Sequence, residues 1–228
     1  GGHTYNIILD EKKPDMEQFV KIEILVGFSN EDITDVVDAR NTSNQVRDES
    51  LMNLAGAFEH LKKALQNAPY FSKIAFKEFE TDSEGNPKPI DVREVVAILT
   101  AFDRDHFNEN VHPINTYRSK AACLSHFKEN QSSYKKIYPL AKEILALYDH
   151  IQDRMPELYN KVRGQSGGVS GGKFGKLTGV TVYGARGHSE LFFIGKKSKY
   201  GVPDGFVYPT LGAFRALLEE KAGRYVWG

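Results

Sequence analysis

The pattern of apolar and polar positions is most regular in the middle of the chain, where it predicts helices. From Leu51 to Leu65 apolar residues recur every three or four positions, which is the spacing of the buried stripe of an amphipathic helix. A second apolar group, residues 95–99, follows Asp91 and Glu94 at the spacing of a capping box. We therefore expect a helix over each of these segments.

The same reasoning extends the helical region toward the C-terminus. Ser119 stands where it would cap a helix that runs through Phe127. Pro139 suits the first turn of a further, long helix, which we expect to be kinked before Pro156. Together these patterns predict a helical body over residues 51–163.

The two flanks of this body have a different pattern. Residues 19–28 alternate with a period of two, as a strand does, and they lie within a small α/β unit predicted over residues 1–50. Residues 164–176 are rich in glycine and predict a linker. A β-β-α tail is expected over 177–228, its helix running from Tyr208 to Glu220. The predicted fold class is thus α+β and predominantly helical.

Composition narrows the function classes. Thirty basic residues balance thirty acidic ones, which argues against a broadly basic nucleic-acid-binding surface but leaves room for a local basic patch. Cys123 is the single cysteine, which excludes an internal disulfide and fits a reduced, cytoplasmic setting. No apolar run approaches the roughly 20 residues that a membrane-spanning helix needs, so we expect no membrane partner.

Motifs with catalytic chemistry are weak. The run GGVSGGKF nearly spells a phosphate-binding P-loop, but Phe174 stands where that motif needs Ser or Thr, and a linker is favoured. Lys77, Glu78 and Glu80 resemble the carboxylate–lysine grouping of some nucleases. An exposed edge strand is the favoured interpretation of these three residues, so no catalytic residue is predicted.

The histidines are scattered and do not form a recognised metal motif. His106 and His112 share a loop with Asp103 and Asp105, so a metal site is conceivable there. A solvated loop is the favoured interpretation because metal ligands need a defined geometry. His126 is expected on a helix, in a packing or surface role. We therefore predict no metal ligand, and no cofactor is indicated.

A polar segment between two apolar ones is the strongest candidate site. It places six hydrogen-bonding side chains in a row, from Arg40 to Gln45, more than a helix cap needs. If it folds against the first residues, the backbone N–H groups of that glycine turn would be ready to bind an anion. The ligand-binding residues predicted on this basis are Gly1, Gly2, His3, Thr4, Arg40, Asn41, Asn44 and Gln45.

Several stretches of this sequence resemble a known bacterial family. GGHTYNIILDE, FVKIEILVGF and ARNTSNQVRDESLMNLAGAFEHLKKAL are similar to segments of the abortive-infection phage-resistance (AIPR) proteins. Members share a Gly-His/Gln-Thr turn and a later Asn-rich segment, which correspond here to residues 1–4 and 41–45. Because members are usually longer at the N-terminus, the resemblance implies a fragment that lacks a strand before Gly1.

A more distant resemblance is to the ParB and sulfiredoxin-like nucleotide-binding fold, in which a turn with paired arginines opens a helix and binds phosphates. The order of predicted elements in residues 1–50 is similar to that fold. His3 and Thr4 stand where the paired arginines would be, and Asn44 replaces a later arginine. This departure weakens the case for tight triphosphate binding, because arginines supply the bidentate phosphate contacts.

The resemblance implies an antiphage defence protein with a polar site for a nucleotide or a nucleic-acid phosphate. Two alternatives stay open: a helical interaction scaffold without ligand chemistry, and part of a defence-associated nuclease. Self-association is also open.

Overall fold

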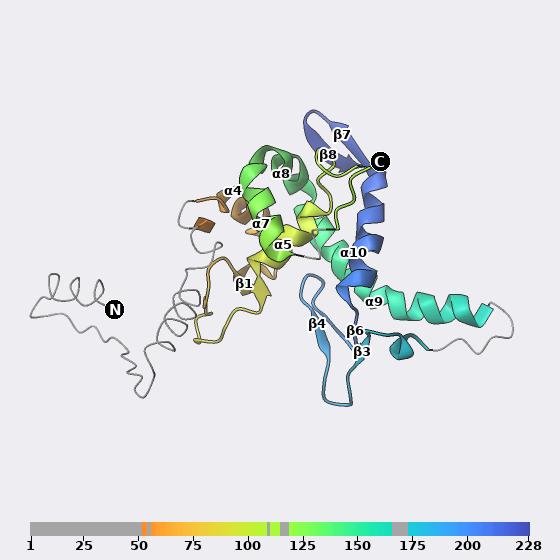
Figure 1. Cartoon of the computed structure of the whole chain (residues 1–228). Helices are drawn as coiled ribbons and strands as arrows, with labels where there is room; N and C mark the ends of the chain where they lie inside the picture. Colours follow the sequence, from red (N-terminus) through yellow and green to blue (C-terminus); the bar gives the residue numbers. More distant parts are fainter. Residues whose placement is uncertain (1–51, 54–55, 109, 115–118, 166–172) are drawn as a thin grey trace, which may run out of the picture. The chain divides into compact units, whose positions relative to one another are not determined.

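The computed structural model describes residues 52–53, 56–108, 110–114, 119–165 and 173–228 (Figure 1). The chain divides into two compact units, residues 1–45 and 46–228, and every described residue belongs to the second. The predicted strand at 19–28 and the ParB-like unit lie outside the described residues. Within the described ones, every helix is too short or too polar to span a membrane.

The described residues form a mixed α+β structure in which helices dominate, as the sequence predicts. The helices are α4 (Glu59–Leu65), α5 (Val92–Thr100), α7 (Lys120–Glu129), α8 (Gln131–Ile137), α9 (Ala141–Gln165) and α10 (Asp204–Ala213). Short 3-10 turns follow or precede them: η1 (Phe71–Lys73), η2 (Tyr138–Leu140), η3 (Phe174–Lys176) and η4 (Phe214–Leu217).

The strands are short and pair only two at a time. β1 (Ile74–Ala75) and β2 (Ile90–Asp91) are parallel. The antiparallel pairs are β3 (Thr181–Val182) with β6 (Tyr200–Gly201), β4 (Ser189–Leu191) with β5 (Lys196–Ser198), and β7 (Leu218–Lys221) with β8 (Arg224–Trp227). Such small sheets depend on packing against helices for their stability.

Helix α5 lies at the centre of the core and packs against α7, α8 and α9 (Figure 1). All its residues from Val95 to Thr100 are buried. Asp91 caps its N-terminus, as predicted, by accepting a hydrogen bond from the Arg93 N–H at 2.8 Å. The predicted capping box also requires the Glu94 carboxylate to accept from the Asp91 N–H. This part of the prediction is wrong, because the Glu94 carboxylate pairs with Lys120 at 2.9 Å.

The amphipathic helix predicted from Leu51 to Leu65 is interrupted in the structure: Met52 and Asn53 are helical, but residues 56–58 form a turn. Gly56 has φ +72, a left-handed conformation that ends a helix and that glycine adopts without strain. Helix α4 begins only at Glu59. Its predicted buried stripe is confirmed at Phe58, Leu61 and Leu65, all fully buried.

The predicted helix starts around Ser119 and Pro139 are confirmed in outline. Ser119 Oγ accepts from the Ala122 N–H at 3.1 Å at the start of α7. Pro139 lies in η2, directly before the long helix α9, which continues through Pro156 to Gln165.

The C-terminal prediction needs correction at both ends of its helix. Helix α10 begins at Asp204, four residues before the expected Tyr208, and residues 218–220 belong to strand β7 rather than to the helix. The hairpin β7–β8 turns through Ala222 and Gly223, both with positive φ. Alanine is uncommon at such a position, so the sequence carries no standard hairpin signal there.

The end of the predicted linker packs on helix α9 and strand β6. Phe174 is buried and contacts the rings of Tyr159 and Tyr200. Its N–H donates to Asn160 Oδ1 on α9 at 2.9 Å. The residue that breaks the P-loop pattern therefore has a packing role.

Candidate functional site

The predicted ligand-binding residues lie outside the described part of the chain, so their geometry stays a prediction: Gly1, Gly2, His3, Thr4, Arg40, Asn41, Asn44 and Gln45. The described part offers three other features with functional chemistry. They are a His–Asp cluster, a hollow lined by two arginines and an apolar groove.

The His–Asp cluster consists of Asp103, His106 and His126. Asp103 is fully buried, and its Oδ2 lies 2.9 Å from His106 Nδ1 and 2.7 Å from His126 Nε2. The two imidazole rings meet edge to face with centroids 4.8 Å apart. Two imidazoles thus converge on one carboxylate oxygen.

Local structure explains why these residues meet. Asp103 lies three residues after the end of α5 and starts a turn, in which the Phe107 N–H donates to the Asp103 carbonyl at 3.0 Å. This turn brings His106, three residues on, back to the Asp103 side chain. His126 comes from α7, which packs on α5.

Neighbouring groups hold the cluster in place. Asn130 Nδ2 lies 3.2 Å from His126 Nδ1 and donates to the His126 carbonyl at 3.0 Å. If Asn130 donates to Nδ1, then Nε2 carries the proton that His126 gives to Asp103. The other carboxylate oxygen, Asp103 Oδ1, accepts from the Asp105 N–H at 3.2 Å.

This geometry corrects the interpretation of the Asp103–His112 loop. Asp103 is buried and hydrogen-bonded, so the expectation of a solvated loop is wrong for this residue. His112 is exposed and is not part of the cluster. His126 belongs to the cluster, although the sequence predicts a packing or surface role for it. The spacing of Asp103 and His106 is a local signal, but the contact with His126 depends on helix packing.

Asp105 connects the same turn to the C-terminal hairpin. It accepts from Lys136 at 3.1 Å and from the Tyr225 hydroxyl at 3.1 Å. Partial burial acts to raise the pKa of Asp105, but the hydrogen bonds from Lys136 and Tyr225 outweigh burial and lower the pKa below its usual value. Asp105 is therefore a structural anion at neutral pH.

Arg104 and Arg215 line a hollow of about 640 Å³ beside this turn. Phe107 and five polar or small residues complete the lining: Asn108, Asn110, Gly212, Ala213 and Ala216. Arg104 donates to the Leu218 carbonyl, and Arg215 donates to the Phe107 carbonyl at 3.2 Å. Burial, and next the charge of Arg104, lower the pKa of Arg215. Among the described residues, no carboxylate forms an ion pair with either arginine.

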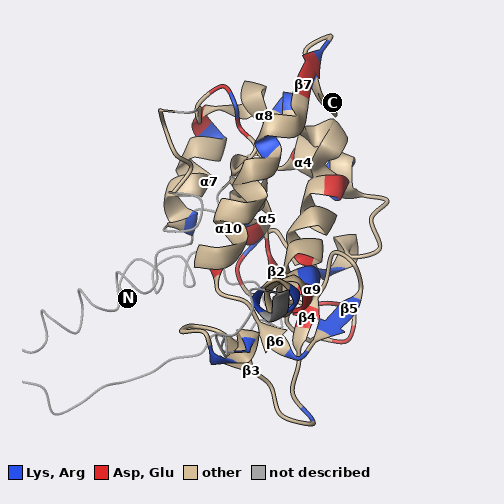
Figure 2. Ribbon diagram, turned by 90° about the vertical axis from the view of Figure 1, so that its right-hand side faces the viewer, with Lys and Arg blue, Asp and Glu red and all other residues tan. Residues whose placement is uncertain are grey.

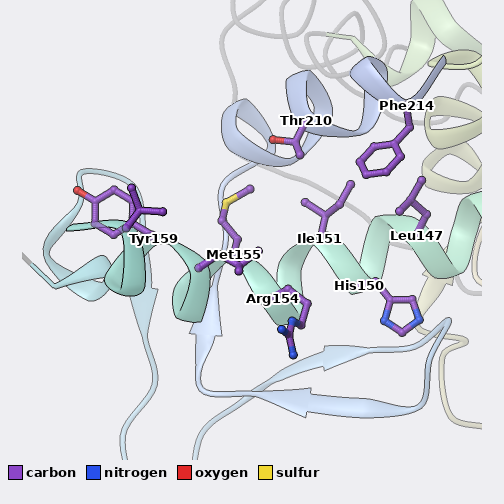
Figure 3. A pocket seen from close by; sticks show the side chains of 10 residues that line it. Leu147, His150, Ile151, Arg154, Met155, Tyr159, Thr210 and Phe214 are labelled. Atoms are coloured by element: carbon purple, nitrogen blue, oxygen red, sulfur yellow. The ribbon is translucent and has the colours of Figure 1, made fainter. Parts of the chain in front are cut away.

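An apolar groove of about 580 Å³ runs between α9 and α10 (Figure 3). Phe214 closes one wall of the groove. Helix α9 forms the other with apolar residues at helical spacing: Leu147, Ile151, Met155, Leu158 and Val162. His150 and Arg154 also line it. Leu158 is 47% exposed and Val162 61% exposed, so part of this stripe faces solvent.

Elsewhere acidic and basic residues are mixed along the elements (Figure 2). In the grouping that resembles a nuclease, Glu80 Oε1 pairs with Lys88 at 2.7 Å, and Glu80 Oε2 accepts from the Phe76 N–H at 2.7 Å. The contact with Lys88 closes the turn over residues 81–87. Glu80 thus has a structural role in this turn. The expected edge strand is wrong for residues 77–80, because strand β1 ends at Ala75.

Comparison with known proteins gives one result. The family model described as AIPR protein matches residues 1–227. No curated protein and no solved structure matches the chain. Because the family match covers nearly the whole sequence, this chain belongs to the AIPR family, and membership implies a role in phage resistance or abortive infection.

Proposed function

We propose that this chain serves phage resistance by binding a phosphate group of a nucleotide or a nucleic acid. The observation that carries the proposal is the hollow lined by Arg104 and Arg215. Two neighbouring guanidinium groups repel each other, and an anion between them would relieve that repulsion.

Both arginine side chains are held in place and keep N–H donors for such a ligand. Each guanidinium has five N–H donors and gives one to a backbone carbonyl, of Leu218 or Phe107. That bond restrains the side chain and leaves further donors for bidentate contacts with phosphate oxygens. The carboxamides of Asn108 and Asn110 add neutral donors at the same hollow.

The N-terminal residues are a second, separate part of this proposal. In this proposal the backbone of Gly1 and Gly2 approaches a phosphate closely, since neither residue has a side chain. His3 and Thr4 touch that phosphate. Further polar residues orient it or add charge: Arg40, Asn41, Asn44 and Gln45. The support for this set is the family resemblance and the donor-rich sequence.

Binding measurements can test both sets. We would titrate a fluorescent ATP analogue and a short labelled DNA with the wild type, Arg215→Gln and a His3→Ala/Asn41→Ala double variant. Arg186→Gln is the matched control, because Arg186 is exposed and does not line the hollow.

We expect Arg215→Gln to weaken binding about tenfold and to lower its salt dependence, as loss of one phosphate contact does. Equal binding by Arg215→Gln and Arg186→Gln would contradict the role of the hollow. Equal binding by the double variant and the wild type would contradict the N-terminal set.

The apolar groove favours a second candidate function, a helical interaction scaffold. Its occupant would be an amphipathic helix of a partner protein with acidic residues at the margin, facing His150 and Arg154. In a phage-resistance assay, Leu158→Asp should then abolish protection. Lys161→Asp, on the same helix but away from the groove, should keep it. Full protection by Leu158→Asp would exclude the groove from function.

A further inference from the structure

We propose that Asp103, His106 and His126 bind one divalent transition-metal ion, with Zn²⁺ as the reference ion. This inference goes beyond the proposed phosphate site and does not depend on it. The three ligand atoms lie within 4.8 Å of one another. They come from two separate segments, the turn after α5 and helix α7, which the core packs together.

The donor set selects the kind of ion. Two imidazoles and one carboxylate suit zinc and the neighbouring first-row metals, whereas Mg²⁺ and Ca²⁺ prefer sets made of oxygen alone. Three protein ligands also leave at least one position for water, as in catalytic rather than structural zinc sites. A dication would balance the charge of a carboxylate that is fully buried.

Binding a metal ion would move the ligands in two ways, because their atoms span up to 4.8 Å. The two imidazole nitrogens must approach each other, and Asp103 Oδ2 must move away from both. In tetrahedral zinc sites with bonds near 2.0–2.1 Å, neighbouring ligand atoms lie about 3.3 Å apart. Here Asp103 Oδ2 is 2.9 and 2.7 Å from the two imidazole nitrogens, so a metal would lengthen these two distances by about half an ångström. His106 can make that movement because its side chain is 40% exposed.

Surrounding groups match the supporting layer of a metal site. The Asp105 N–H holds Asp103 Oδ1 at 3.2 Å, leaving Oδ2 for the ion. To bind through Nε2, His126 must carry its proton on Nδ1. The Asn130 carboxamide, turned by 180°, would accept that proton in exchange for its present bond to the His126 carbonyl. Such hydrogen bonds orient imidazole ligands in known metal sites.

The experiment is a metal titration of the full chain after treatment with a chelator. Co²⁺ reports its own coordination through visible absorption, and Zn²⁺ competition then gives the zinc affinity. The variants are His106→Ala and His126→Ala. His112→Ala is the matched control, because His112 follows in the same loop, is exposed and lies outside the cluster.

We expect the wild type and His112→Ala to bind one ion, and His106→Ala and His126→Ala to bind it at least tenfold more weakly. Lack of saturable binding at one ion per chain, or equal affinity in all four proteins, would overturn the proposal. Circular dichroism checks folding. If His126→Ala unfolds, the half-exposed His106 provides the decisive variant. None of these outcomes requires nucleotide binding, so failure of the phosphate proposal would be seen separately.

Discussion

Thr100 and Tyr134 join α5 to α8 through a hydrogen bond in the core. Their hydroxyl oxygens lie 2.6 Å apart, and both side chains are buried. Thr100 Oγ1 is also 2.7 Å from the Val96 carbonyl, and a carbonyl can only accept a hydrogen bond. Thr100 therefore donates along its own helix, and Tyr134 donates to Thr100. Burial raises the pKa of Tyr134 well above its usual value, so the tyrosine keeps this proton at any physiological pH.

This pair predicts unequal costs for its two single variants. Tyr134→Phe removes one donor and leaves Thr100 bonded to Val96, so it should lower the free energy of unfolding by about 1 kcal/mol. Thr100→Val leaves a buried tyrosine hydroxyl without its partner and should cost about 1–3 kcal/mol.

Urea denaturation of both variants and the double variant measures the coupling. The double variant should be more stable than the sum of the single losses predicts. Strict additivity would contradict a direct bond between the two hydroxyls.

The Asp149 carboxyl predicts a pH dependence of stability. Burial raises its pKa from 3.8 to about 7, although the Phe193 and Ile194 N–H groups act to lower it. The folded protein thus holds a proton between about pH 4 and 7 that the unfolded chain releases. Over this window, rising pH should lower the free energy of unfolding by up to a few kcal/mol.

Asp149→Asn isolates this effect, since the amide oxygen can still accept from the Phe193 N–H, now 2.7 Å from the carboxylate. The measurement is the difference in unfolding free energy between the variant and the wild type from pH 4 to 8. The difference should move in favour of the variant as pH rises to about 7 and then stay level. A flat difference would mean that Asp149 is already ionised at pH 4.

The cap of α7 predicts a local loss of stability. Ser119→Ala removes the acceptor for the Ala122 N–H, which should lower the free energy of unfolding by about 1 kcal/mol. Ser125→Ala is the control, because Ser125 is exposed within the same helix. Thermal unfolding should show no loss for the control, and equal melting temperatures for both variants would rule out the cap.

The sequence predicted those features that depend on near neighbours. The apolar run at residues 95–99 and the caps at Asp91 and Ser119 act within one or two helical turns, and the structure has them. Gly56 was not identified as a helix end because glycine also occurs inside helices, and only its φ of +72 separates the two cases.

The His–Asp cluster shows where prediction from sequence stops. Asp103 and His106 are three residues apart, but His126 lies 20 residues further on, and several other histidines were equally plausible partners. Which histidine meets Asp103 is decided by the packing of α7 on α5. The charge of Asp103 suggested a solvated side chain, whereas the fold buries it.

The position of Trp227 gives the protein an optical signal of its own. It is the single tryptophan, its indole N–H donates to Glu143 at 2.6 Å, and its ring meets Phe102 edge to face at 6.0 Å. Phe102 precedes Asp103 directly. Ions or nucleotides that disturb this turn should therefore change the tryptophan emission, so unlabelled protein can report on both neighbouring sites in one titration.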